Sequence, residues 1–360
     1  MADRLLLPTT SGPLHPDVVR SEFERLHEAA VEFEGSTLAR NTQIVYQRAW
    51  TRFEAWCRRR GATPLPAPPE LIRLYATDLV TTGIPHADGT PAERPGSLRT
   101  LDLHLAAIGY AHESRFPGQE SPVRKIPKHF RQGVKRKLSK PPRKKEWVGA
   151  AQLAEFVSPY ADTLRGKRDK AILLCAFDSG GRRRSEVTGM RAEHLRRDRA
   201  SGDWLWSIPK TKTTDELVVV VPQVGGSLCA ATALADWLAA SGITDGPVFR
   251  RVFDVEGREE LRCREVDGQD EGLQPRHVAT LVQRAAEAAG LNPADYGGHS
   301  LRAGFLTDMS RDGHRLEDLM ARSGHRSVDV AMGYVRVGRM LGEDDPMRRS
   351  LREKRRSPPK

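Results

Sequence analysis

Hydrophobic residues recur at intervals of three and four in the first third of the chain, which is the period of an amphipathic helix. The clearest apolar stripe consists of Tyr46, Trp50, Phe53 and Cys57. Aromatic residues in a row can stack on nucleic-acid bases, but at helical spacing they more commonly pack in a core. We therefore expect this stripe to face the core of a helical domain.

Two further helices are predicted after this one. The proline-rich segment 61–70 ends the first helix, because proline lacks the amide hydrogen that would continue it. An apolar pattern restarts directly afterwards, and Ser97 can cap a third helix. The apolar face of that third helix is formed by Leu98, Leu101, Leu105 and Ile108. Residues 36–138 are thus predicted to be a small all-α domain, preceded by an N-terminal extension, residues 1–35, with one helix.

The pattern changes after Trp147. Two apolar helical segments come first, followed by two short runs rich in apolar and β-branched residues at 203–209 and 216–222. Such runs, bounded by turn residues, predict two antiparallel strands. The turn between them contains Lys210 and Lys212.

Helical periodicity returns after Leu228 and continues to the end of the chain. The exception is segment 253–272, which is highly charged and is predicted to be an irregular surface insertion. The whole pattern predicts a mainly α fold with a small antiparallel sheet, the α+β class. We expect a second domain over residues 150–345, a linker at 139–149 and a C-terminal tail at 346–360.

Positive charge is concentrated before the second domain. The chain carries a net charge of +11, and residues 115–145 hold twelve basic residues against the single acid Glu120, which is again +11. A codon bias toward arginine would spread the charge evenly, so the concentration indicates a polyanionic partner. The candidate binding residues are Arg124, Lys125, Lys128, Arg131, Lys135, Arg136, Lys137, Lys140, Arg143, Lys144 and Lys145. The tail 346–360 is also basic, and there we favour a solvated segment.

Cysteine usage and hydropathy indicate the compartment. The four cysteines are dispersed and form no Cys-x-x-Cys pair, which argues against a zinc ribbon or a disulfide framework and fits a reducing environment. The longest apolar run is too short to span a bilayer, and the first residues do not resemble a signal peptide. We expect a cytoplasmic protein, associated with the nucleoid in a bacterium.

The last quarter of the chain contains the strongest candidate chemistry. His299 and Arg302 lie three residues apart in a helical pattern, so both should project from one face. His325 directly follows Gly324, a typical helix stop, and Tyr334 comes nine residues later. A histidine three residues before an arginine occurs twice elsewhere, so that pair alone carries no weight and the full series is needed.

The tyrosine is expected to lie on a helix of its own. Ser327 can cap this helix, and Asp329 is favourable in its first turn because the N-terminal end of a helix attracts negative charge. Tyr334 would then lie about two turns into the helix.

Charged residues earlier in the chain extend this series of candidate catalytic residues. Arg183 lies three residues before Glu186 at a predicted helix start, and Lys210 and Lys212 lie in the strand turn. With these residues, the order Arg, Lys, His-x-x-Arg, Gly-His, Tyr resembles the tyrosine recombinase (phage-integrase) family. The resemblance covers roughly residues 36–340 and is most specific in the second half. In the first half it rests on a helical domain with a basic linker, which is similar to the core-binding domain of that family.

The resemblance implies roles for the upstream residues. Arg183 matches the arginine of the Gly-x-Arg-x-Ser-Glu box, and Glu186 matches the acidic residue of that box. Lys212 is the better match for the strand-turn lysine, with Lys210 as the alternative. Arg182 departs from the pattern, because an apolar residue is usual at its position.

The resemblance also implies roles for the C-terminal residues. His299 and Arg302 match the His-x-x-Arg box, His325 matches the Gly-His box and Tyr334 matches the nucleophile. Arg336 stands where a histidine often follows the tyrosine. These residue types suit phosphoryl transfer, which needs fixed positive donors on the non-bridging oxygens and an in-line attacker.

Individual steps follow from this assignment. Tyrosine has an ordinary pKa near ~10, so Tyr334 needs a base, which His299 can supply. Lys212 can protonate the departing deoxyribose oxygen, and His325 can donate a hydrogen bond to a phosphate oxygen. Glu186 is expected to orient its neighbours rather than to react.

The resemblance further implies a reaction and its partners. The product is a 3′-phosphotyrosine with a free 5′-hydroxyl, so resealing requires neither nucleotide nor metal, and no cofactor is expected. The partner is duplex DNA carrying recombination sites, held in a clamp of two domains by four protomers. Segment 340–360 is the candidate for docking on a neighbouring protomer, and the sequence does not identify accessory or directionality proteins. The expected biological role is the integrase of a phage or other mobile element.

Three alternatives remain open at this point. A type IB topoisomerase uses similar residues to relax DNA without exchanging partners. A non-catalytic DNA-binding regulator of the same fold would lack catalytic groups, and none is missing here. The two histidines, His299 and His325, could instead bind zinc, but no third ligand at suitable spacing is evident.

Overall fold

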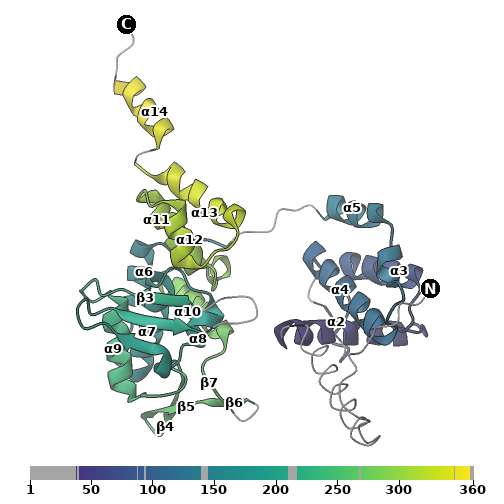
Figure 1. Ribbon diagram of the computed structural model, residues 1–360, viewed down its shortest axis with the longest axis horizontal. Helices are drawn as coiled ribbons and strands as arrows, with labels where there is room; N and C mark the ends of the chain where they lie inside the picture. Colours follow the sequence, from purple (N-terminus) through teal and green to yellow (C-terminus); the bar gives the residue numbers. More distant parts are fainter. Residues whose placement is uncertain are drawn as a thin grey trace, which may run out of the picture. The chain divides into compact units, whose positions relative to one another are not determined.

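The chain divides into two units, Met1–Pro142 and Arg143–Lys360, and each has its own hydrophobic core. The structure is a computed structural model (Figure 1). It describes residues 38, 40–86, 88–92, 95–138, 145–209, 217–266, 269–343 and 345–356. The predicted N-terminal helix, most of the linker and the two turn lysines therefore lie outside the described residues.

The first unit is helical, as the periodicity predicted. Phe53 and Cys57 of the apolar stripe are fully buried, and Trp50 packs against the same core. The hydroxyl of Ser97 accepts a hydrogen bond from the amide of Thr100 at 3.1 Å, which confirms the predicted cap. The elements are α2 (Arg40–Arg58), α3 (Pro69–Thr81), α4 (Leu98–Arg115), a short 3-10 helix η1 (Pro122–Lys125) and α5 (Lys128–Lys137).

One of the other His-x-x-Arg pairs belongs to this core. His112 is buried, its Nδ1 lies 2.8 Å from the carbonyl oxygen of Ile108, and its Nε2 accepts a hydrogen bond from the amide of Ala67 at 2.9 Å. His112 therefore has a structural role, which joins α4 to the segment before α3.

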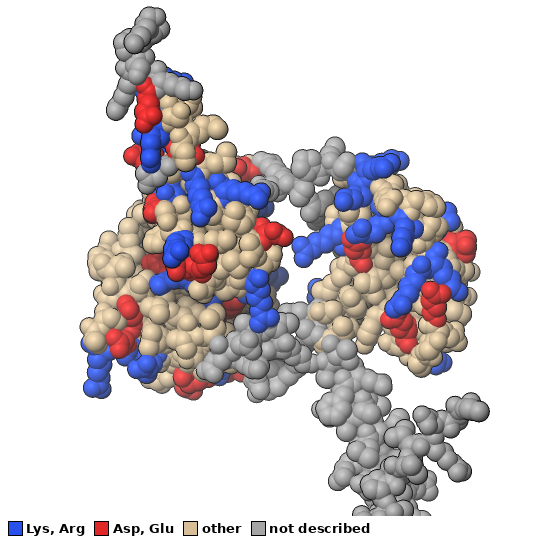
Figure 2. Space-filling model, turned by 45° about the horizontal axis from the view of Figure 1, so that its top comes forward, with Lys and Arg blue, Asp and Glu red and all other residues tan. Residues whose placement is uncertain are grey.

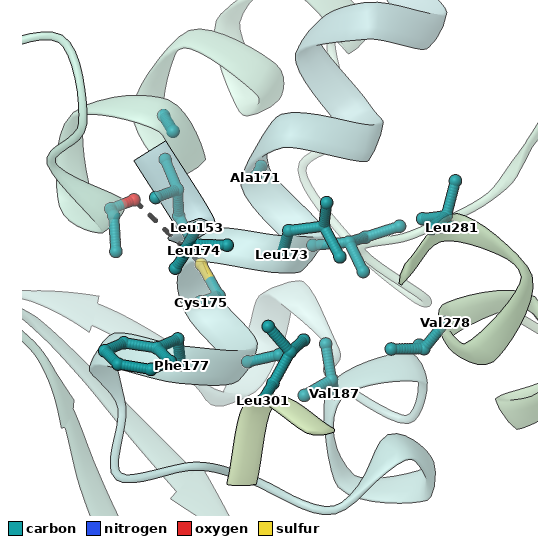
Figure 3. Packing of buried hydrophobic residues seen from close by; sticks show 14 of the residues in the cluster. Leu153, Ala171, Leu173, Leu174, Cys175, Phe177, Val187, Val278, Leu281 and Leu301 are labelled. Carbon is teal, nitrogen blue, oxygen red and sulfur yellow. Dashed lines mark hydrogen bonds between the residues drawn. The ribbon is translucent and has the colours of Figure 1, made fainter. Parts of the chain in front are cut away.

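The second unit is built around α7 (Leu164–Asp178). Residues 171–177 are buried without interruption, so this helix is surrounded on all sides rather than exposing one polar face. Figure 3 shows its side chains meeting Val278 and Leu281 of α10 (Pro275–Ala288), Leu301 of α11 (Ser300–Arg311) and Val187 of α8 (Arg184–Thr188). Its other neighbours include α6 (Ala150–Val157) and α9 (Ala230–Ser241).

The predicted strand pair is present and is joined by a third strand. The sheet is antiparallel with the order β1 (Leu195–Arg197), β2 (Trp204–Ile208) and β3 (Leu217–Val221). Trp206 pairs with Val219, and both are buried against the core of the unit. Sequence periodicity missed β1 because a strand of three residues is too short to show alternation.

The prediction that residues 253–272 are irregular was wrong. They contribute to two antiparallel hairpins, β4 (Arg251–Val255) with β5 (Arg258–Arg262), and β6 (Arg264–Val266) with β7 (Gln269–Glu271). The first hairpin turns at Glu256 and Gly257, whose φ angles of 52° and 79° are those of a two-residue hairpin turn. Charged residues occupy the exposed positions of these strands and obscured their alternation.

The C-terminal part of the unit consists of three more helices. Gly324 is left-handed with φ of 67° and ends α12 (Leu316–Ser323), as predicted. Ser327 caps α13 (Val328–Leu341), where its hydroxyl accepts a hydrogen bond from the amide of Val330 at 3.4 Å. The last helix, α14 (Pro346–Arg356), stands away from the rest of its unit (Figure 1).

None of the helices in the described ranges is long and apolar enough to cross a lipid bilayer.

Helices α11 and α13 pack at close range through small residues. The hydroxyl of Ser310 donates to the carbonyl oxygen of Val335 at 2.9 Å. Gly338 lies against the backbone of α11, and a Cβ atom there would collide with the carbonyl oxygen of Thr307. This contact fixes the position of Tyr334 one turn earlier on α13.

Two glycines of α13 should respond in opposite directions to alanine. Gly338→Ala is expected to lower the free energy of unfolding by about 1–3 kcal/mol, because the added methyl group overpacks the helix contact. Gly333→Ala is the control on the same helix; its Cβ meets no atom within 4 Å, so the change should raise stability by about 0.5–1 kcal/mol. Urea denaturation of the full chain measures both, and equal effects of the two substitutions would contradict the packing argument.

Candidate active site

The loop after α7 brings Arg182 and Arg183 beside α11. Gly181 has a φ of 66°, and a Cβ atom at this position would lie 2.9 Å from the Cα atom of Arg302. Glycine alone permits both the left-handed backbone and this close approach. The carbonyl oxygen of Gly181 then accepts a hydrogen bond from Nη1 of Arg302 at 2.6 Å.

Arg302 is the buried centre of the site. Its side chain projects from α11, and the residue is only 3% exposed. Nη1 donates to the carbonyl oxygens of Gly181 and Ser323 at 2.6 and 2.8 Å. Nε lies 3.3 Å from Nε2 of His325, and Nη2 lies 3.0 Å from its Nδ1. Burial, followed by the charge of Arg183, lowers the pKa of Arg302 to about 10, at which it remains a cation at neutral pH.

His325 is held between a hydroxyl and a guanidinium. Its Nδ1 lies 2.7 Å from the Oγ atom of Ser323, and its ring faces Arg302. Burial, followed by the positive charge of Arg302, lowers the pKa of His325 to about 4. The imidazole is therefore neutral at physiological pH.

His299 stands at the N-terminal end of α11, where it is the residue before the first helical position. The residue is only partly covered by its neighbours and remains accessible to solvent, whereas Arg302 three residues later is buried. Partial burial and the nearby charges of Arg184 and Arg302 lower its pKa. The side chain of Arg184 lies directly over the backbone of Gly298 and brings its charge to this helix end.

Arg183 and Glu186 form a rigid pair at the start of α8. Nη1 of Arg183 lies 2.7 Å from Oε1 of Glu186, and the amide of Arg183 donates to Oε2 at 2.9 Å. Glu186 thus caps the helix and orients the guanidinium. About half of the Arg183 side chain (48%) is exposed, so its remaining donors are accessible to a ligand.

Tyr334 lies beside both histidines. Its ring centroid is 6.3 Å from that of His325, and the two ring planes are tilted by 49°. Tyr334 is half-buried against the core, and it lines a hollow of about 530 Å³ together with His299, Trp147 and Lys145. The hollow is walled by α11 and α13 and by the segment before α6.

The structure thus brings five predicted residues into one site: Arg183, His299, Arg302, His325 and Tyr334. Glu186 lies beside them through its pair with Arg183. Lys210 and Lys212 lie outside the described residues, so the assignment of the lysine stays a prediction. Across the described part of the chain, no three or more His, Cys, Asp or Glu side chains gather as a metal site.

The predicted polyanion-binding residues lie in several environments. Lys125, Lys128, Lys135, Arg136 and Lys137 are exposed on η1 and α5, and blue side chains gather over that edge of the first unit in Figure 2. Two others form exposed ion pairs: Arg124 with Glu113 at 3.3 Å and Arg131 with Asp102 at 2.6 Å.

The remaining four of these residues belong to the linker. Lys145 differs from the others because its Nζ donates to the carbonyl oxygen of Ala294 within the second unit. Lys140, Arg143 and Lys144 lie outside the described residues.

Sequence reasoning missed three residues of the site. Ser323 immediately precedes the Gly-His pair, and its hydroxyl and carbonyl hold His325 and Arg302. Arg184 brings charge to His299, and Trp147 lines the hollow beside Tyr334. For Arg184 alone the sequence offered a signal, because it belongs to the arginine run 182–184, in which Arg182 occupies a position where an apolar residue is expected.

Comparison with known proteins finds chains that this protein resembles. An integrase/recombinase xerD homolog from Selenomonas ruminantium is 27% identical over 333 residues, 89% of each chain. Recombinase cre from Escherichia phage P1 is 24% identical over 302 residues, which cover 80% of this chain and 81% of that protein. A lambda integrase dimer bound to a COC′ core site has a similar fold, with a TM-score of 0.53, 13% identity, and coverage of 90% of this chain and 95% of that one.

These relatives are recombinases and integrases, and a match of residues 147–339 to the model of the phage integrase family agrees with them. The chain belongs to the phage integrase family, and as an enzyme it is a tyrosine-type site-specific recombinase.

The pKa of His325 can be tested directly. In the unfolded chain a histidine has an ordinary pKa near ~6.5, whereas the folded value is about 4. The folded state therefore binds fewer protons between these values, and stability should fall as the pH drops from about 6.5 toward 4. Imidazole NMR shifts of the DNA-free protein should show His325 neutral at pH 6, with His325→Gln identifying the resonance. Protonation of that resonance near pH 6.5 would contradict the environment described for the ring.

Proposed function

We propose that the protein cleaves and rejoins duplex DNA at specific recombination sites through a 3′-phosphotyrosine at Tyr334, as the integrase of a phage or other mobile element. The observation that carries this proposal is the convergence of Arg183, Arg302 and two histidines beside one tyrosine. Cationic donors around a single hydroxyl nucleophile suit a phosphodiester, which is an anion that gains charge on its oxygens during attack.

The arginines are assigned to the phosphate oxygens. Nη1 of Arg302 is committed to two backbone carbonyls, which leaves Nε and Nη2, now directed at His325, as the donors for the substrate. Arg183 offers its outer donors from the opposite loop while Glu186 holds its position. Two planar forks anchored in this way need little reorganisation when the phosphate arrives.

The tyrosine and the histidines are assigned to the chemical step. The oxygen of Tyr334 attacks phosphorus, the bond from phosphorus to the 5′ oxygen breaks, and the tyrosine proton passes to His299. His299 can accept this proton because its pKa is lowered and it is neutral near pH 7. His325, also neutral, donates a hydrogen bond to a phosphate oxygen, and Lys212 or Lys210 supplies a proton to the departing 5′ oxygen.

The basic surface of the first unit is assigned to the DNA backbone. The lysines of α5 are exposed to solvent, which suits contacts to the phosphates of a nucleic-acid backbone. The ion pairs of Arg124 and Arg131 are exposed and hence weak, so they can be exchanged for phosphate contacts. We extend the proposal to two domains closing around one duplex, with duplex DNA as the partner.

Assembly on DNA is the last part of the proposal. Four protomers on two sites would permit strand exchange in pairs. Support for contact between protomers comes from α14, whose Met347 and Leu351 lie one turn apart and are 72% and 49% exposed. An apolar face on a helix that stands away from its own unit favours docking on another copy.

The nucleophile assignment is tested by covalent trapping on a nicked synthetic site. Wild-type protein should form a protein–DNA adduct resistant to denaturation, and Tyr334→Phe should form none, because only this oxygen can attack. Tyr160→Phe is the control, since this tyrosine lines a different hollow from the one that Tyr334 and His299 line. An adduct that persists in the Tyr334→Phe protein refutes the assignment.

Supercoil relaxation without recombination between two sites would indicate a topoisomerase instead.

The DNA-binding assignment predicts a steep salt dependence. If six to ten phosphates are neutralised, affinity should fall by roughly 10³–10⁵ between about 50 and 200 mM salt. Replacing Lys128, Lys135 and Lys137 by glutamine should reduce the slope by about 0.9 for each lost contact. Lys167→Gln is the control, because that lysine is paired with Asp162 at 2.8 Å. A wild-type slope near zero, or a slope unchanged in the triple variant, argues against this role for α5.

A further inference from the structure

Arg182 directs its charge into the protein, although its neighbour Arg183 faces outward. Arg182 is only 2% exposed and is among the largest fully buried side chains. Nε donates to the carbonyl oxygen of Ser179 at 3.1 Å, and Nη2 donates to the carbonyl oxygen of Arg322. Nη1 is buried and has no hydrogen-bond partner among the described residues.

Among the residues that the structure describes, Arg182 has no carboxylate to neutralise its charge. Within the described ranges no carboxylate lies within 4 Å of its guanidinium, and the nearby Glu186 is already paired with Arg183. Burying a charge without a partner is strongly unfavourable. A contrast is found in the same unit, where Arg168 is 3% exposed and pairs with Asp169 at 2.6 Å.

The side chain joins the two turns that build the active site. One end of the link is the loop 179–183, and the other is the turn 322–325, which carries His325. Arg302 binds the same turn at the carbonyl oxygen of Ser323, one residue further on. Two guanidinium groups thus hold consecutive carbonyl oxygens of this turn from the inside.

Arg182 also acts on the site through its field. Its charge contributes to lowering the pKa values of both Arg302 and His325. Burial and the charges of other arginines have larger effects on these two pKa values. In a partly dehydrated site such a field extends further than it would in water. A fixed positive charge of this kind stabilises any state of the reaction in which negative charge accumulates nearby.

We propose that Arg182 is a positioning residue for the reaction, which fixes the turn that carries His325 and places beneath the site a positive charge that the scissile phosphodiester neutralises. This inference rests on the proposed function, since it assigns the missing counter-charge of Arg182 to the DNA. An apolar residue could fill the same volume, but it would neither bind the two carbonyl oxygens nor supply the field.

The test compares two variants on two substrates. Arg182→Met retains length without charge, and Arg182→Lys retains charge without the planar fork. Each is assayed in single-turnover cleavage of a nicked site that carries either the natural phosphodiester or a neutral methylphosphonate at the scissile position. Arg322→Met is the matched control, because Arg322 lies on the same turn with its side chain exposed.

The expected result is a loss that depends on the substrate charge. Arg182→Met should cleave the phosphodiester at least ~10-fold more slowly than wild type, and the difference should shrink below ~3-fold on the methylphosphonate. Arg182→Lys should recover part of the rate on the phosphodiester only. Arg322→Met should remain within ~2-fold of wild type on both substrates.

Other outcomes distinguish a failure of the inference about Arg182 from a failure of the proposed function. An equal loss on both substrates overturns the role of the charge and leaves Arg182 only as a support of the turn, and a wild-type rate for Arg182→Met overturns the inference entirely. If circular dichroism shows that the Met variant does not fold, Arg182→Gln replaces it as the neutral variant, and an equal loss of its rate on both substrates would exclude a role for charge. If wild-type protein forms no adduct on the phosphodiester, the proposed function itself has failed.

Discussion

The candidate active site depends on one buried guanidinium, that of Arg302. This group ties three elements together, because it donates to the carbonyl oxygens of Gly181 after α7 and Ser323 at the end of α12, and contacts His325 beyond it. A buried cation tolerates little displacement, since lost hydrogen bonds in a dehydrated site are not replaced by water. The same interactions that satisfy Arg302 therefore also set the spacing between the arginine loop and the histidine turn.

The candidate site gathers several cationic side chains. Arg182 and Arg183 lie close enough to Arg302 and His325 to lower the pKa values of both, and Glu186 acts in the opposite direction on Arg182 and Arg302. Mutual repulsion of this kind destabilises the free protein and is relieved when an anion enters. Backbone carbonyls and tight glycine contacts hold these cationic groups in place in the folded state, which is the preorganisation that the proposed reaction requires.

Local signals in the sequence were sufficient for most of the helical fold. The caps at Ser97 and Ser327 and the stop at Gly324 depend on nearest neighbours, and all three occur as predicted. Segment 253–272 was misjudged because its strands are half exposed and rich in charge, so the alternation that identifies a strand was weak. The strand β1 was missed for a related reason, since three residues cannot display a period.

By itself the sequence determined which chemical groups are present and how they lie along their own helices, because helix period and capping act over a few residues. Only the tertiary structure decided that Arg183 and Arg302, more than one hundred residues apart, share one site with Tyr334. It also decided that Ser323 orients His325 and that Arg182 is turned inward rather than exposed. These outcomes depend on packing between distant segments and on the cost of burying charge, and neither is recorded in a local pattern of residues.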